Sequence, residues 1–101
     1  MKYNKFGELL FEGQILNGEI IGKGKIFWNN TLKFEGNYLN GEKNGKGKEF
    51  NNYGILIFDC DYFNGEKDGK GKEYFNNEII YEGEYLNGKN GKEKEKNILI
   101  I

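Results

Sequence analysis

The sequence contains no proline, although 16 of its 101 residues are glycine. A chain that is rich in glycine but lacks proline is neither collagen-like nor a typical low-complexity linker. Aromatic residues make up 16% of the chain and supply the apolar area that disordered segments lack. We therefore predict one folded domain, which is also what a chain of this length can form.

Histidine and arginine are absent as well, so all 15 basic residues are lysine. Histidine is the commonest general base and metal ligand, and its absence counts against an enzyme and against a bound metal or cofactor. Arginine is the usual reader of nucleic-acid bases, and a net charge of −1 offers no basic excess. We expect a protein that is not an enzyme, needs no cofactor and binds no nucleic acid.

Cysteine and long apolar runs are also scarce. The single cysteine, Cys60, cannot form a disulfide within the chain, which is typical of a reducing compartment. No apolar run approaches the length of about 20 residues that a membrane-spanning helix needs. Residues 1–10 contain Lys2, Lys5 and Glu8 and lack the apolar segment of a signal peptide. These features predict a cytoplasmic location.

Four segments of the chain repeat one pattern of residues. Each begins with Phe or Tyr and an acidic residue, and each ends with Asn-Gly and a charged residue. Their first residues are 23, 24 and 23 positions apart, and the segments occupy residues 11–19, 34–42, 58–66 and 81–89. A Gly-Lys pair follows each segment, at Gly22, Gly45, Gly69 and Gly91. A regular repeat of this length indicates one small structural unit stacked on its neighbours.

Each repeat is predicted to be a β-hairpin. Aromatic and polar residues alternate before the Asn-Gly pair, which is the preferred pair for a two-residue hairpin turn. Asn29-Asn30, Asn51-Asn52 and Asn76-Asn77 mark the turns between repeats. No segment has a helical period. The sequence therefore predicts an all-β, single-layer antiparallel meander of about nine strands, roughly 40 Å long.

The repeats divide the chain without interruption. Residues 3–10 match residues 50–57 in length and character, so the chain opens on the second half of a repeat. We predict a single domain over residues 1–101, made of a half repeat and four repeats at 1–10, 11–33, 34–57, 58–80 and 81–101. The apolar residues 98–101 are predicted to fold back as a final strand or to mediate self-association.

The pattern also predicts how the strands pair. If Gly13 faces Gly24, Phe11 pairs with Ile26, and both pairs point to one face of the sheet. The other face then has an acid opposite a lysine in every hairpin, a pairing worth about 0.2–1 kcal/mol each. The register also predicts that Ile15 faces Gly22 and that the acid–lysine pairs are Glu12–Lys25, Glu35–Lys48, Asp59–Lys72 and Glu82–Lys94. One face should be charged and the other should hold aromatic rings and glycines.

This pattern, with Phe/Tyr-Glu-Gly-x-Tyr-x-Asn-Gly followed by Gly-Lys-Gly, resembles the MORN repeat over residues 10–96. The resemblance implies a twisted, single-layer sheet whose aromatic face forms a groove that binds a peptide or helix of a partner protein. It implies that the residues lining this groove are Phe11, Phe34, Tyr38, Phe58, Tyr62, Tyr81 and Tyr85. The chain departs from the family pattern at Ile15, at Cys60 and at Glu93. Phe27, Phe50 and Tyr74 come one position later than the common spacing.

Three other motifs were weighed as sites. The Gly-Lys-Gly-Lys stretches lack the strand, loop and helix context of a phosphate-binding loop. Residues 59–65 resemble a calcium loop, but the ligand spacing is wrong and no glutamate occupies the twelfth position. Cys60 has no histidine to activate it as a nucleophile. None of these stretches predicts a catalytic, metal or phosphate site.

We therefore expect a non-enzymatic scaffold that binds a protein or peptide partner. One alternative is a peripheral membrane module that binds anionic lipid through the lysine face, although the facing carboxylates neutralise most of that field. A second alternative is a purely structural or self-associating segment. An enzyme is not expected, because every acid and lysine occupies a repeated position, which a catalytic group would interrupt.

Overall fold

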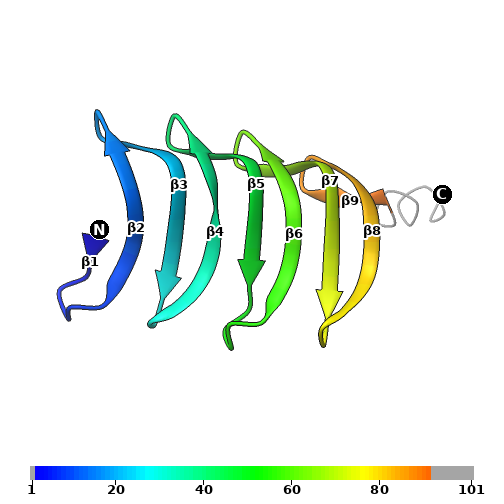
Figure 1. Cartoon of the computed structure of the whole chain (residues 1–101), viewed down its shortest axis with the longest axis horizontal. Coiled ribbons are helices and arrows are strands. Elements are labelled where there is room, and N and C mark those ends of the chain that lie inside the picture. The colour runs from blue at the N-terminus through cyan, green and yellow to red at the C-terminus, as the bar shows by residue number, and fades with distance from the viewer. Residues whose placement is uncertain (1, 92–101) are drawn as a thin grey trace, which may run out of the picture.

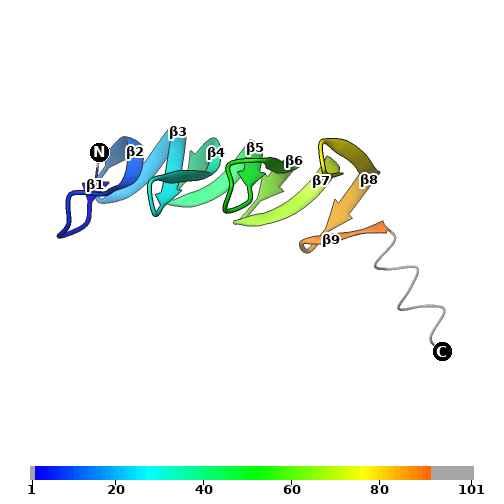
Figure 2. The ribbon, with the colours of Figure 1, turned by 90° about the horizontal axis from the view of Figure 1, so that it is seen from below.

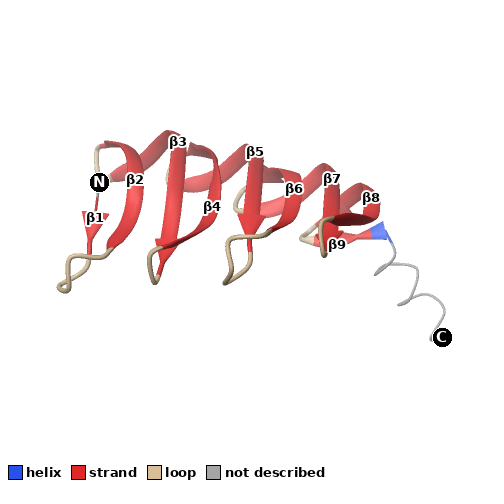
Figure 3. Cartoon of the chain, turned by 60° about the horizontal axis from the view of Figure 1, so that its bottom comes forward, coloured by secondary structure: helices blue, strands red, loops and turns tan. Residues whose placement is uncertain are grey.

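The computed structural model describes residues 2–91, which form one open sheet of nine antiparallel strands (Figure 1). Each strand pairs with its neighbours in sequence, so the meander predicted from the repeats is confirmed. Figure 3 shows the described chain almost wholly as strand. The strands are β1 (Lys2–Tyr3), β2 (Leu9–Leu16), β3 (Glu19–Trp28), β4 (Thr31–Leu39), β5 (Glu42–Phe50), β6 (Leu56–Phe63), β7 (Glu66–Phe75), β8 (Glu78–Leu86) and β9 (Lys89–Asn90).

The sheet is elongated, and the described part of the chain forms no second layer (Figure 2). Its principal extents are 48 × 30 × 21 Å, and its radius of gyration is 15.2 Å. A compact globule of this chain length would have a radius of gyration of about 13 Å. The long axis crosses the strands, so each repeat lengthens the molecule and contacts only the repeats beside it.

The Asn-Gly turns lie along one edge of the sheet, at the top of Figure 1. Asn40 and Gly41 both have positive φ, 52° and 81°, as a type I′ turn requires, and the other Asn-Gly pairs repeat these angles. The last three of these turns also bind the preceding repeat: the Gly41 N–H, for example, donates to the Ile20 carbonyl at 3.1 Å. Equivalent bonds join Gly65 to Lys43 and Gly88 to Lys67. The turns therefore hold successive hairpins together.

The turns at the opposite edge are of two kinds. Asn29-Asn30 and Asn76-Asn77 form two-residue turns with positive φ at both positions, as predicted. The turn between β5 and β6 is longer. In it the Asn51 side chain accepts hydrogen bonds from the N–H groups of Tyr53 and Ile55. Asn4 organises residues 4–8 in the same way. This longer loop accounts for the one repeat of 24 residues.

The predicted pairing of glycines and of charges is confirmed in the first three hairpins. Gly13 pairs with Gly24, and Glu12 with Lys25; the equivalent pairs Glu35–Lys48 and Asp59–Lys72 also form. Lys94, Glu93 and residues 98–101 lie outside the described residues. In the structure Glu82 pairs with Lys72 of the preceding strand.

The predicted pairing of Ile15 with Gly22 is wrong. Ile15 pairs with Ile20, because β3 inserts Gly22 and Lys23 between the partners of Gly13 and Gln14. Gly22 has a φ of +65°, which glycine adopts without strain, and the bulge bends the hairpin. Gly45 and Gly69 occupy the same bulge in the next two hairpins, with φ of 95° and 98°.

The core is a row of aromatic rings lying against the glycine backbone. Phe34 is 3% exposed and Tyr62 is 5% exposed, although no other element among residues 2–91 covers the sheet. A methyl group added at Gly36 would lie 2.6 Å from the Lys46 carbonyl oxygen and 2.9 Å from the Phe34 ring. Only glycine therefore lets the ring and the next strand approach this closely.

Gly36→Ala is predicted to lower the free energy of unfolding by about 2 kcal/mol, because the new methyl group overlaps backbone atoms that cannot move aside. The matched control is Cys60→Ala, at the equivalent position of the third repeat, where a side chain is already accommodated. That change removes one sulfur atom and should cost about 1 kcal/mol or less. Urea unfolding measures both, and equal losses would contradict this account of the glycine row.

Candidate functional site

Charged side chains form a continuous row across seven strands of the sheet. Pairing between adjacent strands places acids and lysines alternately, so each lysine has a carboxylate on both sides. Lys25, for example, pairs with Glu12 on one side and with Glu35 on the other. The whole row runs Glu12, Lys25, Glu35, Lys48, Asp59, Lys72 and Glu82.

A second row of polar residues lies two positions along each strand, on the same face of the sheet. Its members pair as Lys23–Asn37, Lys46–Asp61 and Lys70–Glu84. One residue of each strand lies between the two rows and faces the aromatic side. At these positions only backbone is exposed on the charged face. That floor is formed by Gly13, Gly24, Gly36, Gly47, Cys60, Gly71 and Gly83.

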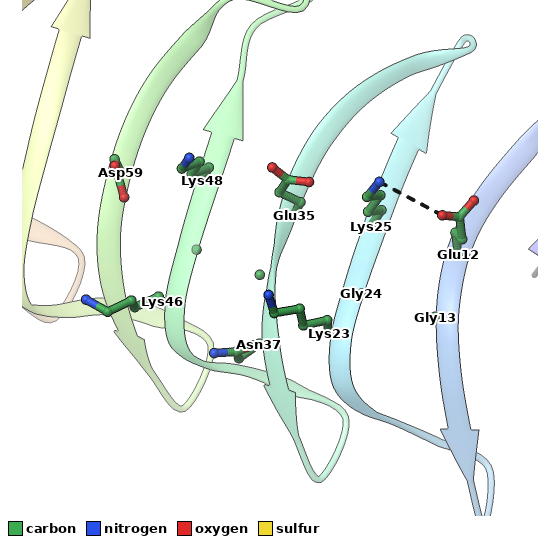
Figure 4. Close-up of a pocket in the computed structure, with 12 residues that line it drawn as sticks. Glu12, Gly13, Lys23, Gly24, Lys25, Glu35, Asn37, Lys46, Lys48 and Asp59 are labelled. Carbon is green, nitrogen blue, oxygen red and sulfur yellow. Dashed lines mark ion pairs between the residues drawn. The ribbon is translucent and has the colours of Figure 1, made fainter.

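The two rows and this floor enclose a groove, which we call the charged groove. One hollow of about 650 Å³ spans its first half and is lined by side chains from β2 to β6 (Figure 4). A second hollow of about 540 Å³ continues it between β5 and β8. Lys46 and Asp59 line both hollows, so the groove is continuous along the sheet.

The charges in the groove are paired only weakly with one another. Lys25 lies 4.0 Å from Glu12, and Lys46 lies 4.0 Å from Asp61, at the outer limit of an ion pair. These side chains are 42–89% exposed, and ion pairs of this kind contribute about 0–1 kcal/mol. Among residues 2–91, Lys23 makes no ion pair, since its partner across the strand is Asn37. The groove can therefore form new polar contacts at little cost.

The seven aromatic residues expected to line a groove lie on the opposite face. Five of them, namely Phe11, Phe34, Tyr38, Tyr62 and Tyr85, are buried with 3–8% of their surface exposed, and Phe58 and Tyr81 are half-buried. Phe34 contacts the rings of both Tyr38 and Tyr62 edge to face, with centroids 5.8 and 5.3 Å apart. The rings lie beneath the floor of the charged groove, and their direct contact with a partner stays a prediction.

A cluster of charged residues within the aromatic face was not predicted from the sequence. The Glu49 carboxylate lies 3.1 Å from the Lys67 ammonium and accepts a hydrogen bond of 2.6 Å from the Tyr62 hydroxyl. The Lys43 ammonium lies 4.1 Å from the centre of the Phe34 ring. The first repeat has Ile20 and Ile26 at the positions of Lys43 and Glu49. This replacement of isoleucine by charged residues was the sequence signal from which the cluster could have been predicted.

Burial and neighbouring charges shift the pKa values in this cluster. Burial alone would raise the pKa of Glu49, but the hydrogen bond from Tyr62 and the charges of Lys67 and Lys43 outweigh it and lower the pKa. The pKa of Tyr62 is raised by burial and by the bond to Glu49. Burial lowers the pKa of Lys43, although Glu49 opposes this. The cluster is a fixed ion pair that joins β5 to β7.

Cys60 occupies the glycine row as a buried residue. Its thiol donates weakly to the Lys72 carbonyl at 3.7 Å, and the opposed Gly71 leaves room for the sulfur atom. Burial raises the pKa of the thiol, which lowers the fraction of reactive thiolate. Phe58, the ring of this repeat, is only half-buried and lies under the Lys67 ammonium at 3.9 Å. Cys60 is a packing residue of the floor.

The described residues offer neither a metal site nor a membrane-spanning helix. Residues 2–91 hold no group of three or more His, Cys, Asp or Glu side chains arranged to bind a metal ion. No helix in this part of the chain has the length and hydrophobicity needed to cross a membrane.

Glu49→Gln is predicted to lower the free energy of unfolding by about 1–2 kcal/mol at neutral pH, because it removes the charge that holds Lys67 and Tyr62. The folded pKa of Glu49 lies below its unfolded value, so its contribution is present above the unfolded pKa and is lost as the pH falls through the folded pKa. Urea unfolding at neutral and acidic pH should therefore show convergence of wild type and variant in acid. A difference that persists unchanged in acid would contradict the electrostatic origin.

The model of the MORN repeat family matches the chain at residues 11–32, 34–55, 61–78 and 81–92. These matches follow the four hairpins, whose glycine row and turns are described above. A search among curated proteins finds no match. MORN repeats are non-catalytic units that are generally associated with protein or membrane interaction. On this pattern of repeats, the chain belongs to the MORN repeat family.

Proposed function

We propose that the chain is a non-enzymatic interaction module that binds an extended segment of a partner protein in the charged groove. The observation that supports this is the groove itself, two adjoining hollows of about 650 and 540 Å³ on the face opposite the buried rings. Its floor is backbone, and its walls are exposed charged side chains with weak internal pairing. A peptide lying across the repeats can hydrogen bond to both walls.

The distribution of charge favours a protein partner over an anionic membrane. Four lysines and three carboxylates line the first hollow, and three lysines and four carboxylates line the second. A lipid surface attracts lysines that are free of neighbouring acids, at about 1 kcal/mol each. Here each lysine of the first row lies between two carboxylates, so little net field remains. Alternating charges suit an extended peptide with side chains of both signs.

The buried rings would support such binding indirectly. They hold adjacent strands at the separation and bend that give the groove its width, since Phe11 and Phe34 each pack against glycines of two strands and Tyr62 packs against Gly47. Replacing Tyr62 would therefore disturb the fold before it disturbed any contact with a partner. Changes to exposed lysines leave the fold intact and test the groove alone.

Lys23→Ser with Lys46→Ser is expected to weaken partner binding at least tenfold, since it removes two charges from one wall of the groove. The matched control is Lys5→Ser with Lys33→Ser, which loses the same charge at positions outside the groove. Pull-down from a cell extract with both variants, followed by titration of the captured partner, measures the effect.

The controls separate three outcomes. Equal losses in both double variants would mean that net charge matters rather than the groove. Unchanged binding by the Lys23 and Lys46 variant would contradict the proposed site. Tight, salt-sensitive binding of vesicles that contain phosphatidylserine, lost in the same variant, would favour a lipid ligand instead.

A further inference from the structure

Four large apolar side chains stand exposed at one equivalent position of every repeat. They directly precede the Asn-Gly turns and lie at the ends of β2, β4, β6 and β8, along the upper edge in Figure 1. Leu39 is 55% exposed and Phe63 is 57% exposed. We call this row the turn-edge stripe, which consists of Leu16, Leu39, Phe63 and Leu86.

The position of the stripe follows from strand alternation. Tyr38 and Tyr62 point into the aromatic core, so Leu39 and Phe63, one residue later, point to the opposite face. Within residues 2–91, no second layer covers this face of the sheet. Single exposed apolar residues are common on protein surfaces, but a regular row of four marks an interaction surface.

The spacing of the stripe matches a helix. Its members lie on alternate strands, so neighbours are about 9.6 Å apart and the row spans about 29 Å. An α-helix advances about 10.5 Å in seven residues. One apolar residue per heptad would therefore reach each member of the stripe in turn, over about 22 residues of helix.

Carboxylates alternate with the apolar side chains along the same edge. Glu19, Glu42 and Glu66 pair across their hairpins with the first three members of the stripe. All three are exposed, and none makes an ion pair among residues 2–91. Glu19 lies beside the next turn, since a methyl group on Gly41 would be 3.8 Å from its Cβ. The first three positions of the stripe therefore carry negative charge without an ion pair, whereas Lys89 pairs with the fourth member, Leu86.

We propose that the turn-edge stripe is a docking site for a basic amphipathic helix of a partner protein. Apolar residues of the helix at seven-residue intervals would contact the stripe, and lysines or arginines beside them would pair with the three glutamates. The carboxylates would repel an anionic membrane, so a lipid surface does not fit the same edge. This surface lies outside the charged groove and does not depend on a peptide bound there.

The test uses a synthetic helical peptide with leucine at every seventh position and lysines on either side of each leucine. A second peptide of the same composition spreads the leucines around the helix. Fluorescence anisotropy should show binding of the first peptide to the wild-type chain and at least tenfold weaker binding of the second.

Leu39→Ser with Phe63→Ser should weaken binding of the first peptide at least tenfold, and Glu42→Gln with Glu66→Gln should weaken it and reduce its salt dependence. The matched control is Trp28→Ser with Phe75→Ser, because these residues are 61% and 65% exposed at the opposite edge. That control, and Lys23→Ser with Lys46→Ser in the charged groove, should leave the affinity unchanged. Circular dichroism and urea unfolding verify that every variant is folded.

Three results would overturn the proposal. If Trp28→Ser with Phe75→Ser weakens binding as much as the stripe variant, the peptide recognises exposed apolar surface in general. If the two peptides bind equally well, the spacing of the stripe has no role. An effect of the groove lysines alone would place the helix in the charged groove, which would contradict the stripe while leaving the proposed function intact.

Discussion

The close approach of aromatic rings to a row of glycines determines the rest of this structure. A sheet without a covering layer must bury its apolar side chains within its own curvature, and the rings do so by lying against backbone that has no side chains. Phe34 packs against glycines of its own strand and of the next one, and it contacts the ring of Tyr62 in the following repeat. Phe11 packs in the same way against Gly13 and Gly24, and the buried rings from Phe34 to Tyr85 belong to one continuous core.

Because this core lies on one face of the sheet, residues on the opposite face are not needed for apolar packing. Residues that alternate with the glycines point away from the rings, so they can be charged without any cost to packing. Acids and lysines alternate along the row, and their pairs set the register rather than supplying much stability. Substitutions at these exposed positions are therefore expected to leave the fold intact. The charged groove and the turn-edge stripe are both built from such exposed positions.

Departures from the repeat show where the core tolerates change. Cys60 replaces a glycine, and the structure accommodates it through Gly71 and by leaving Phe58 half-buried. Glu49 and Lys67 replace apolar residues of the first repeat and stabilise each other as a pair. Glu49 is thus compensated by a second change, at Lys67, whereas Cys60 is accommodated by Gly71, a glycine that the first two repeats also have at this position. The variation along the aromatic face is thus explained by packing and charge, and the surfaces proposed for binding lie elsewhere.

The sequence by itself determined the hairpins, their order and most of their register, because Asn-Gly turns and the alternation of residue types are local signals. It could not determine the bulge that pairs Ile15 with Ile20. Gly22 and Gly24 are two residues apart, as two glycines on one face of a regular strand would be, so the sequence does not show that Gly22 belongs to a bulge. Only the tertiary structure decided that the rings are buried and that the hollow lies on the charged face. The burial of the rings and the place of the hollow both depend on the curvature of the sheet, which is set by many strands together. The contact of Glu49 with Lys67 likewise joins different repeats, and no local pattern specifies it.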